Sequence, residues 1–245
     1  MDQQAQLGTN RTGIAAAPQR AQEMQAGMEE FPPTSQGSAQ DMAQVRIAYA
    51  KEAGPLGSVP QPAGLTNKVQ TAFKAVKGEQ QMLLMDKLGE RLAFERSGTR
   101  LYEALLAKHS AFGSFTGGPS EGDLEHVLKE EYSHFLLLQS VIEQLGGDPT
   151  AVTPSANIQA TISHGIKMVI TDPRTTLLQS LEAILVAELA DSTCWETLVE
   201  LAQAAGEDDL VQPFKQAYMT EQEHLQKVRA WVAAGQGRDG HQSRS

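Results

Sequence analysis

Four long segments of the chain repeat apolar residues at steps of three and four positions, and this pattern constrains the fold more than any other feature. The segments run over residues 79–112, 120–146, 172–205 and 208–232. Steps of three and four place apolar side chains along one face of an α-helix. No alternating run of β-branched residues is long enough to predict a strand. The sequence therefore predicts an all-α protein.

Capping residues predict where these helices begin and end. Ser120 and Asp123 have the spacing of a capping box, so we expect the second helix to begin there. Asp172 is the expected N-cap of the third helix, with Pro173 as its first helical residue, and Gly206 is expected to follow its last residue. The fourth helix then begins directly after this glycine.

The lengths of the connections predict how the helices are arranged. Short connections join the first helix to the second and the third to the fourth, so each pair forms an antiparallel hairpin. The longer connection between the hairpins has a short helical candidate at residues 155–170 and crosses from one hairpin to the other. A helical lead-in over residues 68–77 precedes the first helix. The expected architecture is an antiparallel four-helix bundle with one crossover connection.

The two ends of the chain differ in composition from its middle. Residues 1–66 are rich in Gln, Ala, Gly, Pro and Ser and carry more than half of the 11 prolines. Such a segment buries too little apolar surface to offset its ordering entropy, so we predict a disordered N-terminal extension with transient helices at residues 20–30 and 40–52. The folded domain is expected at residues 67–232, followed by a second disordered tail at 233–245.

Composition excludes several classes of protein. The chain has one cysteine, Cys194, which excludes an intramolecular disulfide and zinc sites built on several cysteines. The formal net charge of −10, most of it within residues 67–232, argues against nucleic acid or an anionic membrane as a partner. No stretch approaches the roughly 20 apolar residues of a membrane helix, and the first residues do not resemble a signal peptide. We therefore expect a cytoplasmic protein.

A glutamate interrupts the apolar face of each of the four segments. In the second and fourth segments a histidine follows one turn later. These residues are Glu95, Glu131, His134, Glu188, Glu221 and His224. An isolated carboxylate on a buried face is very costly unless it is paired or binds a metal ion. The register on the buried face, together with the similar spacing in both hairpins, favours a metal site over a buried polar network.

This ligand set resembles that of the ferritin-like superfamily of di-iron and di-manganese proteins, and the resemblance covers residues 79–232. It implies two bound metal ions, with iron expected and manganese as the alternative. The roles it implies are Glu95 and His134 as ligands of the first ion, Glu188 and His224 as ligands of the second, and Glu131 and Glu221 as bridges. It further implies a redox enzyme whose partners are metal ions and oxygen or hydrogen peroxide.

Three further residues are candidates for a place beside the metal ions. The Glu188-x-x-Asp191 spacing is similar to that of the rubrerythrin group. Because an Asp reaches one methylene less than a Glu, two roles stay open for Asp191: coordination of a metal ion, or a hydrogen bond to a ligand histidine. Tyr102 and Tyr218 share faces with the site as oxidisable phenols, with core filling as the alternative. Trp195 is expected to fill the core.

The resemblance leaves several functions open. The leading hypothesis is oxidation of ferrous iron or removal of peroxide at a di-iron site. The alternatives are a non-catalytic iron-binding or storage subunit, a manganese catalase-like enzyme, a substrate-oxidising enzyme of the same fold, and an interaction protein that keeps the site as a relic. The metal, the substrate, the electron donor and the oligomeric state, including a homodimer, stay open at this stage.

Overall fold

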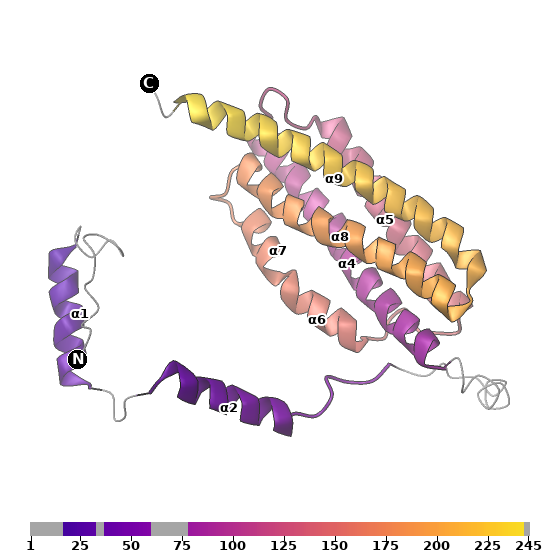
Figure 1. The fold of residues 1–245 in the computed structure, drawn as a ribbon. Helices are drawn as coiled ribbons and strands as arrows, with labels where there is room; N and C mark the ends of the chain where they lie inside the picture. The colour runs from indigo at the N-terminus through magenta and orange to yellow at the C-terminus, as the bar shows by residue number, and fades with distance from the viewer. Residues whose placement is uncertain (1–16, 33–36, 60–77, 243–245) are drawn as a thin grey trace. The chain divides into compact units, whose positions relative to one another are not determined.

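The computed structural model describes residues 17–32, 37–59 and 78–242, and every regular element in these ranges is a helix (Figure 1). The prediction of an all-helical chain is confirmed for this part of the protein. The helices are α1 (Pro18–Glu30), α2 (Ala39–Glu52), α4 (Gly78–Phe112), α5 (Glu121–Gln144), α6 (Pro154–Ile162), α7 (His164–Thr171), α8 (Leu177–Ala205) and α9 (Asp208–Gln242). None of them is long and apolar enough to cross a membrane.

Helices α1 and α2 belong to an N-terminal unit, Met1–Gly54, and neither helix contains a buried residue. They coincide with the two segments expected to form transient helices. Ser38 and Asp41 form a capping box at the start of α2. The rest of the predicted extension, apart from the residues that flank these helices, lies outside the described residues, as does the predicted lead-in at 68–77.

The four long helices of the second unit lie side by side (Figure 1). Helix α4 packs against α5 and α8, and α9 packs against α8 and α5. The long connection between α5 and α8 contains two helices rather than the one expected, because Ser163 ends α6 and precedes α7. Both of these short helices lie against α4, and α7 also contacts α8.

The ends of the helices agree with the sequence at α5 and differ at α8. The Ser120–Asp123 capping box is confirmed, with the Asp123 amide donating to the Ser120 hydroxyl at 3.1 Å. The prediction of Asp172 as the N-cap of α8 is wrong. Its carboxylate accepts hydrogen bonds from Arg174, and Thr176 caps the helix instead. The physical reason is that Asp172 ends α7 and the chain turns once before α8 begins.

Helix α9 extends ten residues beyond its expected end at residue 232 and covers most of the predicted C-terminal tail. Gly235 is buried at this extension, where a Cβ would come within 2.5 Å of Leu178 on α8. The glycine leaves room for the Leu178 side chain, so α9 and α8 pack closely here. Tertiary packing therefore continues a helix that the local composition predicts to end.

The buried side chains form two apolar clusters separated by a polar layer. The first cluster includes Leu88 of α4 and Trp195 of α8, and the second includes Leu105 of α4 and Leu181 of α8. All four long helices contribute to both clusters. In each of these helices the glutamate identified from the sequence falls between its two apolar stretches. The polar layer is therefore enclosed on both sides along the helix axes.

Candidate metal centre

The polar layer brings together all six residues predicted as metal ligands. They are Glu95 on α4, Glu131 and His134 on α5, Glu188 on α8, and Glu221 and His224 on α9. All of them are buried, and the most exposed, His134, is 6% exposed. The helical periodicity predicted an inward direction for each of these side chains, and all six are buried in the structure.

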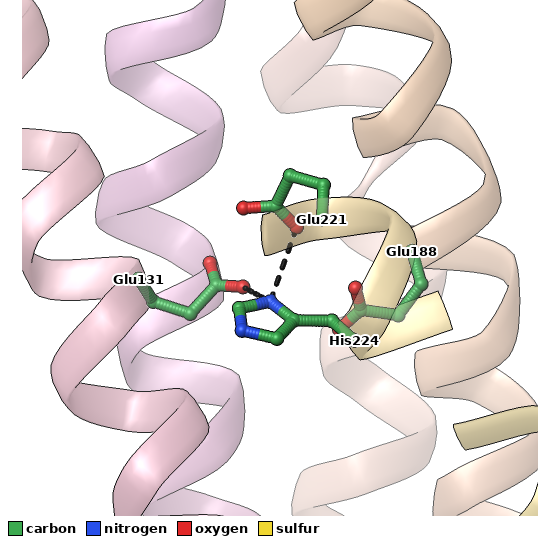
Figure 2. A group of neighbouring side chains, drawn as sticks. All are labelled: Glu131, Glu188, Glu221 and His224. Atoms are coloured by element: carbon green, nitrogen blue, oxygen red, sulfur yellow. Dashed lines mark hydrogen bonds and ion pairs between the residues drawn. The ribbon is translucent and has the colours of Figure 1, made fainter. Parts of the chain in front are cut away.

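Glu221 lies between the two histidines of the layer. Its Oε1 is 2.6 Å from Nδ1 of His134, and its Oε2 is 3.2 Å from Nδ1 of His224. The same nitrogen of His224 is 3.5 Å from Oε1 of Glu131. Figure 2 shows His224 between the carboxylates of Glu131, Glu221 and Glu188. The carboxylate of Glu221 therefore contacts the imidazoles of α5 and α9 through separate oxygens.

Three overlapping groups of these residues have ligand atoms within 4.8 Å of one another. The first group is Glu131, Glu188, Glu221 and His224; the second is Glu95, His134 and Glu221; the third is Glu95, Glu131, Asp191 and Glu221. The first group contains the four residues expected around the second ion, and the second group contains three of the four expected around the first ion, without Glu131. The two groups share Glu221. The third raises the question whether Asp191 is a ligand.

Several carboxylate oxygens of the layer are buried and accept no hydrogen bond. They are Oε2 of Glu95, Oε2 of Glu131, Oε2 of Glu188, Oδ1 of Asp191 and Oε1 of Glu221. The last two lie within ion-pair distance of Arg91 and His134, respectively. Buried acceptors without a donor are rare, because each loses its hydration without replacement. Gly98 on α4 adds a second sign of a built site, because a Cβ there would collide with Oε2 of Glu131. Oxygens left free in this way fit a cation.

Two aromatic side chains hold the glutamates of α4 and α8. The hydroxyl of Tyr102 donates a hydrogen bond to Oε1 of Glu188. The indole N–H of Trp195 donates to Oε1 of Glu95 at 2.9 Å. The expectation that Trp195 only fills the core is therefore incomplete. The sequence contained a signal for this contact. Trp195 follows Glu188 by two helical turns, just as Tyr102 follows Glu95 by two turns.

Tyr218 differs from Tyr102 in its surroundings. It is half-buried and packs against the first apolar cluster, which includes Phe214. This placement agrees with core filling, the alternative that the sequence left open for both tyrosines. Tyr102 is the phenol that touches a predicted ligand.

Sequence reasoning missed Glu130. Its Oε2 lies 2.8 Å from Nε2 of His224 and 3.4 Å from Nε2 of His126, a histidine whose side chain is 61% exposed. A carboxylate on the outer nitrogen of an imidazole fixes the tautomer that leaves the inner nitrogen free to bind a metal ion. Periodicity gave no signal for Glu130, because it lies off the apolar face of α5.

Sequence reasoning also missed Arg91, which is 1% exposed. Its Nη1 is 3.0 Å from Oδ1 of Asp191, and its Nε is 3.6 Å from Oε1 of Glu95. The guanidinium also lies 4.1 Å from the centre of the Phe94 ring. The sequence feature that could have identified Arg91 is its position one turn before Glu95, on a helix face that is otherwise apolar.

Burial and repulsion shift the pKa values of most carboxyl groups in the layer. Burial is the largest cause that raises the pKa of Glu95, Glu188 and Asp191 well above their ordinary values. Burial and the negative charge of Glu221 raise the pKa of Glu131. These groups hold protons more tightly than carboxyl groups in water do, so metal ions must compete with protons for them.

Glu221 and His224 shift in the directions that favour their charged forms. Burial by itself would raise the pKa of Glu221, but its contacts with His134 and His224 lower that pKa to about 2. Burial would lower the pKa of His224, but its contacts with Glu131 and Glu221 raise it to about 12. The layer thus attracts positive charge, as a cation site must.

An open groove of about 340 Å³ leads from the surface to His134. It lies between α5 and α9 and is lined by Glu130, Ser133, His134, Leu137, Pro213, Gln216, Ala217 and Thr220. A second hollow, lined by residues that include Met85 and Gly147, has a volume of only about 10 Å³ and touches none of the predicted ligands. The groove thus exposes one side of a predicted ligand, His134, at its lining.

Comparisons of the chain with models of known protein families, with curated proteins and with solved structures found no match. The chemistry assigned to this site therefore rests on the described side chains. They form an enclosed cluster of carboxylates and imidazoles that can bind metal ions.

Proposed function

We propose that α4, α5, α8 and α9 form a ferritin-like four-helix bundle whose polar layer binds two metal ions, expected to be iron, that react with oxygen or hydrogen peroxide. The observation that carries the proposal is the position of Glu221, whose two oxygens face His134 and His224 separately. The free buried oxygens of Glu95, Glu131 and Glu188 support it. Ferrous iron oxidation and peroxide removal are the proposed reactions.

The chemistry of the donor set supports iron or manganese. Four glutamates neutralise two divalent cations, and a mixture of carboxylate oxygen and imidazole nitrogen suits these metals better than soft copper. In this assignment, Glu95 and His134 bind the first ion, and Glu188 and His224 bind the second. Manganese, in a catalase-like enzyme, is the alternative with the same ligands.

Each neighbour of the ligands has a definite task in this proposal. Tyr102 and Trp195 restrain one oxygen of Glu188 and of Glu95, respectively. Glu130 orients His224. The two apolar clusters exclude water from the layer along the helices. A bound pair of redox-active ions supplies the electrons for reduction of oxygen or peroxide.

The groove supports a second candidate function, the oxidation of a small organic substrate. Oxygen and peroxide need far less room than about 340 Å³, a volume that lies in the range of small-molecule sites. The lining combines the carboxylate of Glu130 and the polar side chains of Ser133, Gln216 and Thr220 with apolar surface at Leu137. Such a lining suits a small polar molecule beside His134.

An anaerobic titration with ferrous iron tests the proposal. We expect metal-depleted protein to bind two ions per chain, and stopped-flow absorbance to record their oxidation on mixing with oxygen or peroxide. Glu188→Gln should lose one ion and most of the oxidation rate. Glu182→Gln is the matched control, because Glu182 is an exposed residue of the same helix.

The outcomes of this experiment separate the functions. A plateau near one ion, or full oxidation by Glu188→Gln, contradicts the ligand assignment. Binding of two ferrous ions without faster oxidation identifies a storage or carrier protein. Turnover with manganese and peroxide, but not with iron, identifies the catalase-like alternative.

A further inference from the structure

The side chains of Arg91 and Asp191 form a buried ion pair at the edge of the polar layer. Nη1 of Arg91 is 3.0 Å from Oδ1 of Asp191, and each residue is 1% exposed. The same nitrogen lies 3.5 Å from the backbone oxygen of Asp191. The pair connects α4 to α8.

Distance alone allows Asp191 to be a metal ligand. Its carboxylate belongs to a group with Glu95, Glu131 and Glu221 in which the ligand atoms lie within 4.8 Å of one another. Coordination through Oδ1 would withdraw that oxygen from Arg91, however. A buried guanidinium that loses its partner is strongly destabilising, because the interior offers it no hydration.

The charge balance of the site also indicates that Asp191 has a different role from the four glutamates. The four glutamates alone balance two divalent ions, and a fifth carboxylate would leave an excess negative charge. Arg91 cancels that excess at a distance of 3.0 Å from Asp191. The two residues together therefore add no net charge to the layer.

Arg91 also lies near one of the two carboxylate oxygens of Glu95, Oε1. Its Nε is 3.6 Å from Oε1 of Glu95, the oxygen that also accepts the hydrogen bond from Trp195. Oε2 of Glu95 is buried and accepts no hydrogen bond. The two neighbours thus occupy one oxygen of Glu95 and leave the other free.

We propose that Arg91 and Asp191 are a neutral positioning pair that stays outside the coordination sphere. Arg91 keeps Asp191 off the metal ions and, together with Trp195, turns Oε2 of Glu95 toward the first ion. This inference rests on the proposed function, because it assumes the two metal ions. It assigns to Asp191 a different role from Glu188, which stands one turn earlier on the same helix.

Infrared difference spectroscopy of the wild-type protein tests whether Asp191 coordinates. Ferrous iron is added anaerobically to protein labelled with ¹³C in the carboxyl groups of either all glutamates or all aspartates. The splitting between the antisymmetric and symmetric carboxylate bands should change for the glutamate label and stay unchanged for the aspartate label. A changed splitting with the aspartate label overturns the proposal. No iron binding and no change with either label would instead refute the proposed function.

A pair of variants tests the neutral-pair role independently. Asp191→Asn leaves Arg91 without its partner, so we expect two ions still to bind, with affinity reduced roughly 10- to 100-fold for one of them. The double variant Arg91→Met/Asp191→Asn removes both charges of the pair, so its affinity should lie between those of Asp191→Asn and wild type, because the charge balance is restored while the contact of Arg91 with Glu95 is lost. A double variant as weak as Asp191→Asn, or one that binds a single ion, contradicts the proposal. If Asp191→Asn fails to fold, the double variant and the infrared experiment still decide.

Discussion

At the scale of single residues, Glu131 is a proposed metal ligand whose burial disfavours its charged form. Burial and the charge of Glu221 raise its pKa, so ionising this carboxyl group costs more in the folded metal-free protein than in water. Glu131→Gln keeps the size of the side chain and removes this charge. We expect the variant to lose oxygen-dependent iron oxidation, while its metal-free form gains about 1 kcal/mol of unfolding free energy.

Chemical denaturation and stopped-flow absorbance measure the two effects of Glu131→Gln. Glu125→Gln is the control, because Glu125 is exposed on the same helix, 3.8 Å from Lys129. The control should match wild type in both measurements. If Glu131→Gln retains both ions and wild-type turnover, Glu131 is not a bridging ligand.

The titrating groups of the layer also predict how stability depends on pH. The site carboxyl groups other than Glu221 have raised pKa values in the folded state, so they stabilise the metal-free fold below the ordinary carboxyl pKa and lose this contribution as pH rises. His224, with its pKa raised to about 12, acts in the same direction above pH of about 6.5. Glu221, with its pKa lowered to about 2, opposes the trend only below pH of about 4.5.

We therefore expect the unfolding free energy of the metal-free protein to decrease between pH of about 5 and 8. The stabilisation added by metal ions should increase over the same range, because binding releases protons. Urea titrations at several pH values, with and without ferrous iron, measure both trends. If the unfolding free energy of the metal-free protein instead increases as pH rises, ionisation of the buried carboxyl groups does not destabilise the fold, and the prediction is wrong.

At the scale of elements, the groove between α5 and α9 predicts how metal ions reach the layer. The six proposed ligands are buried, and the groove is lined by one of them, His134. Gln216 is an exposed residue of its lining on α9. Gln216→Trp should fill the groove and slow the uptake of ferrous iron at least about tenfold, while the plateau of two ions stays unchanged.

The control for this variant is Gln226→Trp. Gln226 is also exposed on α9 but does not line the groove. Rapid mixing of metal-free protein with ferrous iron under anaerobic conditions measures uptake. Equal rates in the two variants would mean that ions reach the layer by another path.

At the scale of the whole molecule, the division of the chain into two units predicts that the second is stable without the first. The boundary lies between Gly54 and Pro55, and the helices of the first unit contain no buried residue. Deletion of residues 1–54 should leave the thermal midpoint within about 2 °C of the full chain and the metal content at two ions. A lower midpoint or a loss of metal would show that the first unit contributes to the fold of the second.

The sequence by itself determined the helical class and the inward direction of the six proposed ligands. Both follow from local physics, because 3.6 residues per turn decides which positions share a face. Glu95 and Glu131, for example, were identified as buried because apolar residues lie at helical spacing on both sides of them. The Ser120 capping box was predictable for the same reason, since its hydrogen bonds join residues three positions apart.

Only the tertiary structure decided which residues meet across helices. Arg91 pairs with Asp191, and Trp195 donates to Glu95, although a hundred positions separate the partners in each case. Periodicity carries no information about such contacts, because they depend on the register in which α4 and α8 pack. The extension of α9 past Gly235 has the same origin, since contact with another helix outweighs a local composition that disfavours helix.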